Sequence, residues 1–365
     1  MKNILLFLVC VLLASSAVAQ NATAIRNAEA QLKVQDYTVV NKQKCISGDR
    51  HNYESLAVYA WPDEKNPAGP YIIKDGQRSP EVDNYDGVKL RQMMSRVRQL
   101  AEGYEASHDE RFARAAIGQL KCWFVDASTM MNPNLDYGQF IPGRYDNMGN
   151  VGGVSEAYDL VKVLNSIDFL KNEGALDKKT DKKLKKWFGQ YAQWMQTSRV
   201  GVASRNVEDN IGIMYDILLY RICMYTGDKA TRKQIIADFN ALRLDRQVAE
   251  DGSQPRELKR TRAMSYSIYN IQHVLNFCEL LKTDGVDYYA LHGDKIDKAV
   301  QFIERYISNK QSFPYKEIGD WTTCQREFAE LKKAYLNLRS AKNDENTAEP
   351  INPMALPSIN VNQLK

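Results

Sequence analysis

The sequence predicts an all-α protein built as an α/α toroid, an incomplete barrel of antiparallel helix hairpins whose long loops form a cleft. Apolar residues recur at three- and four-residue spacing through most of the chain after position 86, which is the period of helices that bury one face. About ten such segments follow one another with short connections, and short connections make neighbouring helices antiparallel. The sequence contains no convincing alternation of polar and apolar residues of the kind that indicates a strand.

The predicted helices can be placed in order along the chain. A polar, Ala-rich stretch over 21–35 predicts a short first helix, and residues 36–86, rich in Pro, Gly, Asn and Asp, predict irregular structure. Gly227, Gly252 and Gly285 stand at breaks between later helices, as residues that end helices do. No repeat of about 30–45 residues is visible, which argues against a solenoid. The later helical segments cover residues 90–100, 112–124, 154–171, 181–197, 209–226, 230–246, 262–283, 294–307 and 324–340.

The N-terminus has the three parts of a secretory signal peptide. Lys2 is followed by an apolar run over 4–14 and by small residues that end at Ala19. The apolar run is too short to span a bilayer comfortably. Cys10 could mark a lipoprotein, but Val9 is a poor residue before a lipidated cysteine. We therefore expect cleavage after Ala19 and a periplasmic or secreted protein that has no membrane segment once the signal peptide is removed.

Four segments make up the predicted domain organisation. They are a signal peptide over 1–19, an N-terminal segment over 20–50, the α/α-toroid domain over 51–342 and a flexible C-terminal tail over 343–365. The tail is rich in Asn, Asp, Glu and Pro, a composition that buries too little apolar surface to fold alone.

Composition limits the classes of partner and cofactor. The 365 residues carry a formal net charge of only +4, which is too weak to indicate nucleic-acid binding but does not repel an acidic polysaccharide. Five cysteines remain after signal cleavage, an odd number without regular spacing, which argues against a disulfide framework. The spacings Cys-x-x-Cys and His-Glu-x-x-His are absent from the sequence. We therefore expect neither a metal site nor a cofactor.

Long non-helical segments are where chemistry is expected, because loops longer than about 12–15 residues in a compact domain are usually functional. Six motifs occur in or beside such segments. They read HNYES at 51–55, YAWPD at 59–63, GPYIIKDG at 69–76, MNPNLDYGQFIPG at 131–143, VEDNIGIMYD at 207–216 and GSQPRELKRTRAMSYS at 252–267.

These motifs resemble, in the same order, segments of the alginate lyase superfamily, which read HDYxS, YxWPD, GPYIxxDG, MNPNLxYxQxIPG, NNHGxxYD and GSQPxELxRTRxxxYS. The resemblance runs from about residue 51 to residue 289. It implies an α/α toroid and an exported polysaccharide lyase that cleaves a uronate-containing, alginate-like polysaccharide by β-elimination. It also implies that Tyr266 carries the proton transfers, and that Asn210 and either Arg260 or Arg262 handle the substrate carboxylate. Spacing does not decide between the two arginines.

The chemistry explains why such residues are needed. In β-elimination a base removes the C5 proton of the uronate and an acid protonates the departing O4. The neighbouring carboxylate must be neutralised, because proton removal builds a second negative charge on it, and Asn, His or Arg donors in a dry cleft can do this. A tyrosine can act as the acid and, if nearby arginine lowers its pKa, as the base.

Two departures from the family pattern leave the activity open. Asp209 replaces the first Asn of NNHG, and Ile211 replaces its His, although isoleucine can neither donate a hydrogen bond nor carry a proton. One interpretation is that Tyr266 still works, with another residue in place of the histidine. A second is a lyase-inactive paralogue that binds glycans. A third is a glycoside hydrolase that uses Glu208, Asp209 and Glu257, since hydrolases need two carboxylates.

Further residues in the motifs are candidates for substrate binding. His51 and Tyr53 could supply hydrogen-bond donors to the cleft, and Trp61 is either a core aromatic or a platform on which a sugar stacks. For Gln139 we favour contact with a sugar, and for Asn134 a structural role in the loop. For Glu257 we favour a capping carboxylate in the first turn of a helix. The residues expected to bind substrate are His51, Tyr53, Trp61, Asn134, Tyr137, Gln139 and Asp209.

Overall fold

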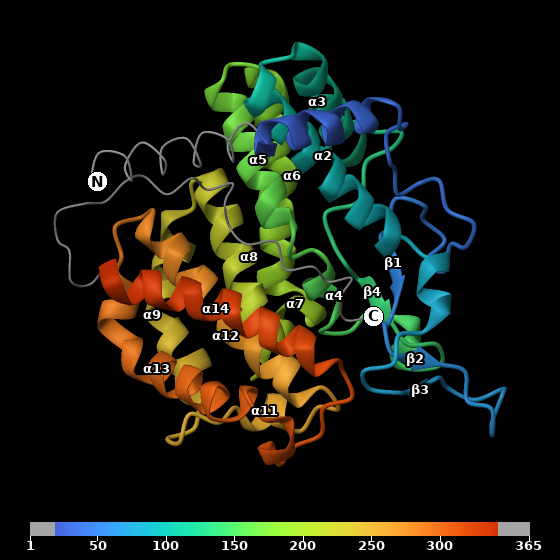
Figure 1. Cartoon of the computed structure of the whole chain (residues 1–365). Helices are drawn as coiled ribbons and strands as arrows, with labels where there is room; N and C mark the ends of the chain where they lie inside the picture. Colours follow the sequence, from blue (N-terminus) through green and yellow to red (C-terminus); the bar gives the residue numbers. More distant parts are fainter. Residues whose placement is uncertain (1–18, 342–365) are drawn as a thin grey trace, which may run out of the picture.

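The computed structural model of the chain describes residues 19–341, and helices make up most of it (Figure 1). The prediction of an all-α fold is therefore confirmed. After a first helix over residues 19–32, the helices are α2 (Gly87–Ser107), α3 (Glu110–Phe124), α4 (Gly153–Glu156), α5 (Leu160–Asn172), α6 (Lys178–Thr197), α7 (Arg199–Arg205), α8 (Asn210–Thr226), α9 (Lys229–Phe239), α10 (Asp245–Gln247), α11 (Pro255–Leu258), α12 (Ala263–Lys282), α13 (Tyr288–Ile307) and α14 (Trp321–Ala341).

The long helices pack on one another in the succession expected for an α/α toroid. Helix α2 packs against α3 and α5, α5 and α6 pack against α8, and α8 packs against α12. Helices α13 and α14 then pack on α12 and on each other. In Figure 1, α2, α3, α5 and α6 lie in the upper part of the molecule and α12, α13 and α14 lie at the lower left. The strands lie toward the right-hand edge.

Four short strands interrupt the region predicted to be irregular and the loop after α3. They are β1 (Glu54–Leu56), β2 (Ala60–Trp61), β3 (Ile72–Ile73) and β4 (Tyr137–Phe140). Strands β2 and β3 pair antiparallel, whereas β1 pairs in parallel with β4. Strands of two to four residues are too short to show alternation, and the partner of β1 is distant in sequence, so a local pattern could not reveal them.

Two predicted helices are divided in the structure. The segment 154–171 breaks between α4 and α5, where Ala157 leaves helical geometry. The segment 230–246 contains a π-helical turn over Asn240–Leu244 between α9 and α10. Such a turn is a single irregular turn inside a helix, and it lies near the end of this segment, where too few residues follow for periodicity to detect it.

Short polar residues begin several helices, and a glycine ends one of them. The side chains of Asp177, Asp209 and Asp228 each accept a hydrogen bond from a backbone N–H in the first turn of α6, α8 and α9 respectively. These are N-caps, which satisfy donors that have no partner inside the helix. Gly227 ends α8 with a φ of 85°, a left-handed conformation that glycine adopts without steric cost.

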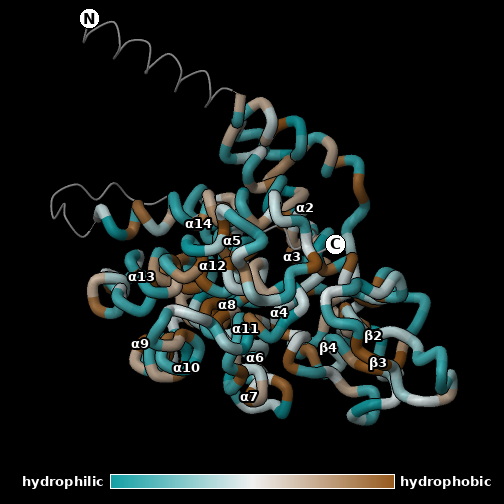
Figure 2. Tube along the Cα trace, turned by 60° about the horizontal axis from the view of Figure 1, so that its bottom comes forward, coloured by the Kyte–Doolittle hydropathy of each residue, from teal (hydrophilic) through white to brown (hydrophobic). Residues whose placement is uncertain are grey.

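The core is built around α8 and α12, which are buried on nearly all sides. A helix that is apolar all round belongs in the interior of a protein. In Figure 2 the two helices run through the body of the molecule, and the trace around them includes strongly hydrophobic segments. The N-terminal segment shares this core, because Ala28 and Val39 are buried in it and Lys42 forms a buried ion pair of 2.6 Å with Asp86.

Several expectations concern the ends of the chain and the cysteines. The predicted signal peptide, apart from Ala19, and the predicted tail over 343–365 lie outside the described residues. Within residues 19–341, none of the helices combines the length and apolarity needed to cross a bilayer. All five cysteines in this range are free, with Cys223, Cys278 and Cys324 buried and Cys45 and Cys122 half-buried.

Candidate active site

A cavity of about 350 Å³ opens where the loops around β1 to β4 meet the N-terminal ends of α5, α8 and α12. Its wall contains residues from five of the six motifs identified in the sequence. Tyr59 and Asp75 come from the loops around β2 and β3, Gln139 comes from β4, Asn210 begins α8, and Tyr266 lies in the first turn of α12. Segments that are far apart in the chain therefore converge on one site.

The parallel pairing of β1 with β4 brings the first and fourth motifs together. The backbone N–H of Gln139 donates a hydrogen bond of 2.7 Å to the hydroxyl oxygen of Ser55. Gln139 has a φ of 53°, which a residue other than glycine rarely adopts. A Cβ atom on Gly152 would meet the Gln139 side-chain oxygen at 2.3 Å. A glycine at position 152 therefore makes room for this side chain on the cavity wall.

Tyr266 is almost fully enclosed, with 5% of its surface exposed. Its phenolic oxygen lies 2.7 Å from that of Tyr59, within hydrogen-bond distance. The guanidinium of Arg260 lies 3.8 Å from the centre of the Tyr266 ring, close enough for a cation–π contact. Tyr266, Tyr59 and Arg260 all line the cavity.

The pKa of Tyr266 corrects one sequence-based expectation. Burial raises this pKa well above its usual range, and the neighbouring Tyr59 raises it further, whereas Arg260 only partly opposes the shift. Nearby arginine therefore acts in the expected direction, but burial of the phenol outweighs it, so the pKa of Tyr266 is not lowered overall. In the unliganded protein the phenol of Tyr266 is neutral near pH 7.

Arg260 and Arg262, which spacing could not separate, lie in different places. Arg260 donates to Asp75 through Nε (3.1 Å) and Nη2 (2.7 Å) and faces the cavity. Arg262 is not on the cavity wall; its backbone pairs with Glu317 in the segment before α14. Only Arg260 is therefore placed to meet a ligand in the cavity.

Asp75 is a site residue that sequence reasoning missed. One of its oxygens accepts the hydrogen bonds from Arg260, and the other accepts hydrogen bonds from the backbone N–H and the hydroxyl of Thr261. Burial raises the pKa of Asp75, but these donors outweigh that effect and hold its pKa below the usual range. The available signal was the Asp of the GPYIIKDG motif.

Asn210 is held by a buried carboxyl group. Its backbone N–H and its side-chain amide each donate a hydrogen bond of 2.9 Å to the same oxygen of Glu257. Burial, followed by the nearby Asp209, raises the pKa of Glu257 to about 7. Glu257 lies in the first turn of α11, as expected, but the backbone N–H that it caps belongs to the start of α8.

The position occupied by histidine in the family pattern is apolar here. Ile211 lines the cavity beside Asn210. Asp209 caps α8 through a hydrogen bond of 2.9 Å from the backbone N–H of Ile211 and is not on the cavity wall. Burial raises the pKa of Asp209. The structure therefore does not support Asp209 as a substrate-binding residue.

Tyr53 also has a structural position, not the predicted one at the cavity. Its side chain is fully buried, and its hydroxyl donates a hydrogen bond of 2.7 Å to Glu156. The hydroxyl of Ser55 donates to the same carboxylate oxygen. Since a fully enclosed phenol cannot reach a ligand, the HNYES motif serves the site through Glu156, which does line the cavity.

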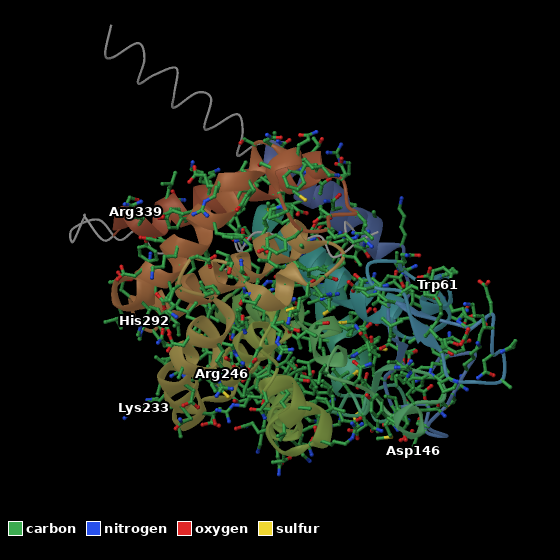
Figure 3. The ribbon with its side chains drawn as sticks, turned by 90° about the horizontal axis from the view of Figure 1, so that it is seen from below. Trp61, Asp146, Lys233, Arg246, His292 and Arg339 are labelled. Carbon is green, nitrogen blue, oxygen red and sulfur yellow. The ribbon has the colours of Figure 1, made fainter. Side chains whose placement is uncertain are left out.

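Four other predicted binding residues lie away from the cavity wall. The His51 ring is bound through Nδ1 to the carbonyl of Met130, at 2.7 Å. The Trp61 indole N–H donates to the carbonyl of Gln77, and the residue lies toward the outer edge of the molecule in Figure 3. Asn134 accepts a hydrogen bond within its own loop, as expected, and Tyr137 pairs with Glu54 between β4 and β1. Of the seven residues expected to bind substrate, only Gln139 lines the cavity.

The three carboxylates considered for a hydrolase do not face the cavity. Glu208 pairs with Arg256 at 3.2 Å and with Arg246 at 3.7 Å, all three being partly exposed. Glu257 is buried against Asn210, and Asp209 caps α8. Because two carboxylates must flank the scissile bond in such enzymes, this placement removes the basis for a hydrolase that uses these residues.

Arg91, from α2, is a second cavity arginine that sequence reasoning missed. Within residues 19–341 its side chain forms no hydrogen bond and no ion pair. Its positive charge nevertheless lies close enough to Glu156 to lower the pKa of that carboxyl group. It lies in a regular helical pattern with nothing in the local sequence to distinguish it. Over the same residues, no group of three or more Asp, Glu, His and Cys side chains is arranged to hold a metal ion.

Comparisons with known proteins agree with this fold. A family model described as alginate lyase matches residues 38–313. Among solved structures, the chain is similar to an alginate lyase from Bacteroides ovatus, with a TM-score of 0.81 and 35% identity over 90% of each chain. It also shares the fold of alginate lyase A1-III from Sphingomonas species A1, with a TM-score of 0.53 and 16% identity over 82% of this chain and 86% of that chain. Among curated proteins, none matches.

Proposed function

The chain belongs to the alginate lyase family, and from this premise we propose that it is a polysaccharide lyase that cleaves a uronate-containing polysaccharide by β-elimination. The observation that carries the proposal is the hydrogen-bonded pair of phenols, Tyr59 and Tyr266, at a cavity that also contains Arg260 and Asn210. Fold and family support a polysaccharide lyase in general. The residue roles given below are the finer part of the proposal.

In the proposed reaction, Tyr266 carries the proton between two positions of the sugar. The electron pair of the C5–H bond forms the C4=C5 double bond, and the C4–O4 bond breaks. The proton taken from C5 goes to Tyr266, and O4 leaves with a proton from Tyr266. The products are an unsaturated uronate at one new chain end and a free hydroxyl at the other, so no oxidant, reductant or water is consumed.

The neutral resting state of Tyr266 makes Tyr59 part of this proposal. A buried phenol is a competent acid for the departing O4, but it must lose its own proton before it can act as the base. A phenolate on Tyr266 would lie beside the positive charge of Arg260, which lowers the pKa of Tyr266, whereas Tyr59 raises it. We therefore assign to Arg260 the stabilisation of ionised Tyr266, and to Tyr59 the hydrogen bond that positions the phenol of Tyr266.

Three groups are proposed to neutralise the substrate carboxylate. Arg91 is the cavity guanidinium that has no ion-pair partner in the described part of the chain, and Arg260 is oriented by Asp75. Asn210 has a second amide hydrogen that its bond to Glu257 does not use. Fixed donors of this kind favour the extra negative charge that develops as the C5 proton leaves.

A second candidate function is glycan binding without catalysis. The observation that favours it is Ile211 on the cavity wall, where the family pattern carries a histidine able to donate a hydrogen bond. An apolar wall at that point removes one donor for the carboxylate. The cavity and its arginines would still suit an acidic sugar.

Export is also part of the proposal. The three-part pattern over residues 1–19 is typical of a secretory signal peptide. Periplasmic or extracellular placement would give the protein access to a polysaccharide. N-terminal sequencing of the protein recovered from an expression host would test it, with Gln20 expected as the first residue.

The lyase activity can be tested with a panel of polyuronates. The purified protein is incubated with polymannuronate, polyguluronate and polyglucuronate, and the ultraviolet absorbance of the new 4,5-double bond is followed. Growth of this absorbance supports the lyase. New reducing ends without the absorbance would indicate hydrolysis, and binding without either signal would indicate the second candidate.

A further inference from the structure

The charges on the cavity wall are unusually well balanced for a site that takes an acidic polymer. Three arginines line it, Arg78, Arg91 and Arg260. Three carboxylates line it as well, Asp75, Glu156 and Asp159. A polymer with a carboxylate on every sugar would bring several negative charges into this space, so the partner of each wall charge decides what the cavity can accept.

Most of these charges already have a partner in the protein. Arg260 is bound by Asp75 at 2.7 Å, and Asp159 is bound by Lys162 at 2.9 Å. Arg78 pairs with Asp83, with a second contact of 3.1 Å between the two groups. These three pairs are each neutral, and within residues 19–341 they leave Arg91 and Glu156 as the wall charges without an ion pair of their own.

Glu156 does not add to the positive charge in either protonation state. Burial raises its pKa, while the hydroxyls of Ser55 and Tyr53 and the charge of Arg91 oppose that shift. If Glu156 is ionised, it balances Arg91 and the wall is neutral. If it is protonated, Arg91 is the one unmatched cation. The wall therefore offers at most one net positive charge to a ligand.

A run of consecutive uronates fits such a wall poorly. Removing a carboxylate from water is costly unless a cation or several donors replace its hydration. One carboxylate can be matched by Arg91 and the donors beside Tyr266, but a second has only paired arginines and nearby carboxylates to face. Like charges placed together in an interface act against binding, and such repulsion is a source of specificity.

We propose that the site selects a polysaccharide in which single uronates are separated by neutral sugars, with Glu156, held by Tyr53 and Ser55, facing hydroxyl groups of the neutral sugar. This inference rests on the proposed lyase function and names its class of substrate. A carboxylate fixed by two donated hydrogen bonds is a rigid acceptor for sugar hydroxyls, and it disfavours a uronate carboxylate at the same position.

The test compares polymers that differ only in how many carboxylates they carry. Polymannuronate, polyguluronate and polyglucuronate are each used intact and after chemical reduction of about half of their carboxylates to hydroxymethyl groups, which leaves the backbone and linkages unchanged. Initial rates of unsaturated product are expressed per remaining uronate. Relief of one like-charge contact should raise this rate on the best polymer at least about threefold, which corresponds to roughly 0.7 kcal/mol.

Two variants assign the discrimination to the wall. Glu156→Gln keeps the shape and the acceptor for Tyr53 and Ser55 but cannot be charged, and it should reduce the gain from carboxyl reduction by at least half. Asp159→Asn removes a second wall carboxylate and should act in the same direction, so that the proposal stays testable if Glu156→Gln fails to fold. Glu304→Gln is the matched control. Glu304 lies on α13 and forms an exposed ion pair with Lys332 of α14, so this variant should keep the full gain.

The outcomes distinguish failure of the substrate inference from failure of the proposed lyase function. A gain on reduction that shrinks in Glu156→Gln supports the inference. Product from intact polyuronates with no gain on reduction overturns it while the lyase function stands. A gain that Glu156→Gln and Asp159→Asn leave unchanged overturns the assignment to these carboxylates. No unsaturated product from any polymer, intact or reduced, overturns the lyase function and this inference with it.

Discussion

The phenolic oxygens of Tyr59 and Tyr266 lie 2.7 Å apart, although 207 positions separate the two residues in the sequence. One comes from the loops around β2 and β3, the other from the first turn of α12. The pair is possible only because the N-terminal loops fold over the end of the helical array. Burial makes Tyr266 a weak acid, so the transfer of its proton depends on how accurately its hydroxyl is held, and Tyr59 is the residue that holds it.

Removing the hydroxyl of Tyr59 should therefore slow the lyase reaction without stopping it. In Tyr59→Phe the phenol of Tyr266 loses the hydrogen bond that positions it, and we expect the rate to fall by about tenfold to a hundredfold, as misplacement of a proton-transfer group does. The check is the pH profile of the initial rate. A rate equal to that of the unmodified protein at every pH would exclude a role for Tyr59.

The two neighbouring arginines should differ sharply in their effect on activity. Arg260→Gln removes a charge from the cavity and should lower the rate by about a hundredfold or more, as loss of a transition-state donor does. Arg262→Gln alters a half-buried residue outside the cavity wall, so it should change the rate less than about threefold even where it affects stability. Steady-state kinetics on one substrate would compare them. Equal losses in both variants, with equal thermal stability, would contradict the placement of Arg260 alone at the site.

Glu257 should make the protein less stable as the pH rises toward neutrality. Its pKa is about 7 in the folded protein against an ordinary value of 4.5, so the native state keeps a proton that the unfolded chain has lost. The free energy of unfolding should then fall between these two pH values, by about 3 kcal/mol from this group. Glu257→Gln retains the acceptor for Asn210 and should lack this part of the pH dependence. Urea unfolding at pH 5 and pH 8 would measure it; identical pH dependence in both proteins would refute the assignment.

Asp216, the last residue of the VEDNIGIMYD motif, has a structural role that can be tested separately. Asp216 is bound by Arg243 through contacts of 2.7 and 3.0 Å, and both side chains are almost fully buried. Arg243→Met would leave a buried carboxylate without its partner and should lower the free energy of unfolding by about 3–5 kcal/mol. Arg246→Met, which loses only an exposed pair with Glu208, should cost less than about 1 kcal/mol. Chemical denaturation compares them, and similar losses would refute the importance of the buried pair.

Much of the fold was predictable because helices leave a local record in the sequence. The buried faces of α8 and α12 and the glycine after α8 all act over a few residues, and each was placed within a few positions of its observed bounds. The strand pair β1 and β4 and the π-helical turn in the segment 230–246 were missed. The first depends on two segments more than eighty positions apart, and the second is followed by only a short helical piece, too few residues for a change of spacing to show.

The sequence predicted a site residue correctly only where that residue belongs to one of the motifs and also lines the cavity. Tyr266, Arg260, Asn210 and Gln139 satisfy both conditions. Tyr53 and His51 belong to the same motifs, but their contacts turn them inward, to Glu156 and to the carbonyl of Met130. Arg91 and Glu156 line the cavity from helical segments with ordinary surroundings, so only the packing of α2 and α4 beside β4 reveals them.

The rate of unsaturated-product formation by Tyr266→Phe is the most direct measurement of the central claim. Phenylalanine keeps the ring, its packing and the contact with Arg260, and removes only the oxygen that exchanges the proton. Tyr145→Phe, at a tyrosine that is 62% exposed, is the matched control. On the polyuronate that the unmodified protein cleaves best, Tyr266→Phe should lose at least about a hundredfold in rate while circular dichroism and thermal stability stay the same and the control keeps full activity. Undiminished cleavage by a correctly folded Tyr266→Phe would contradict the account.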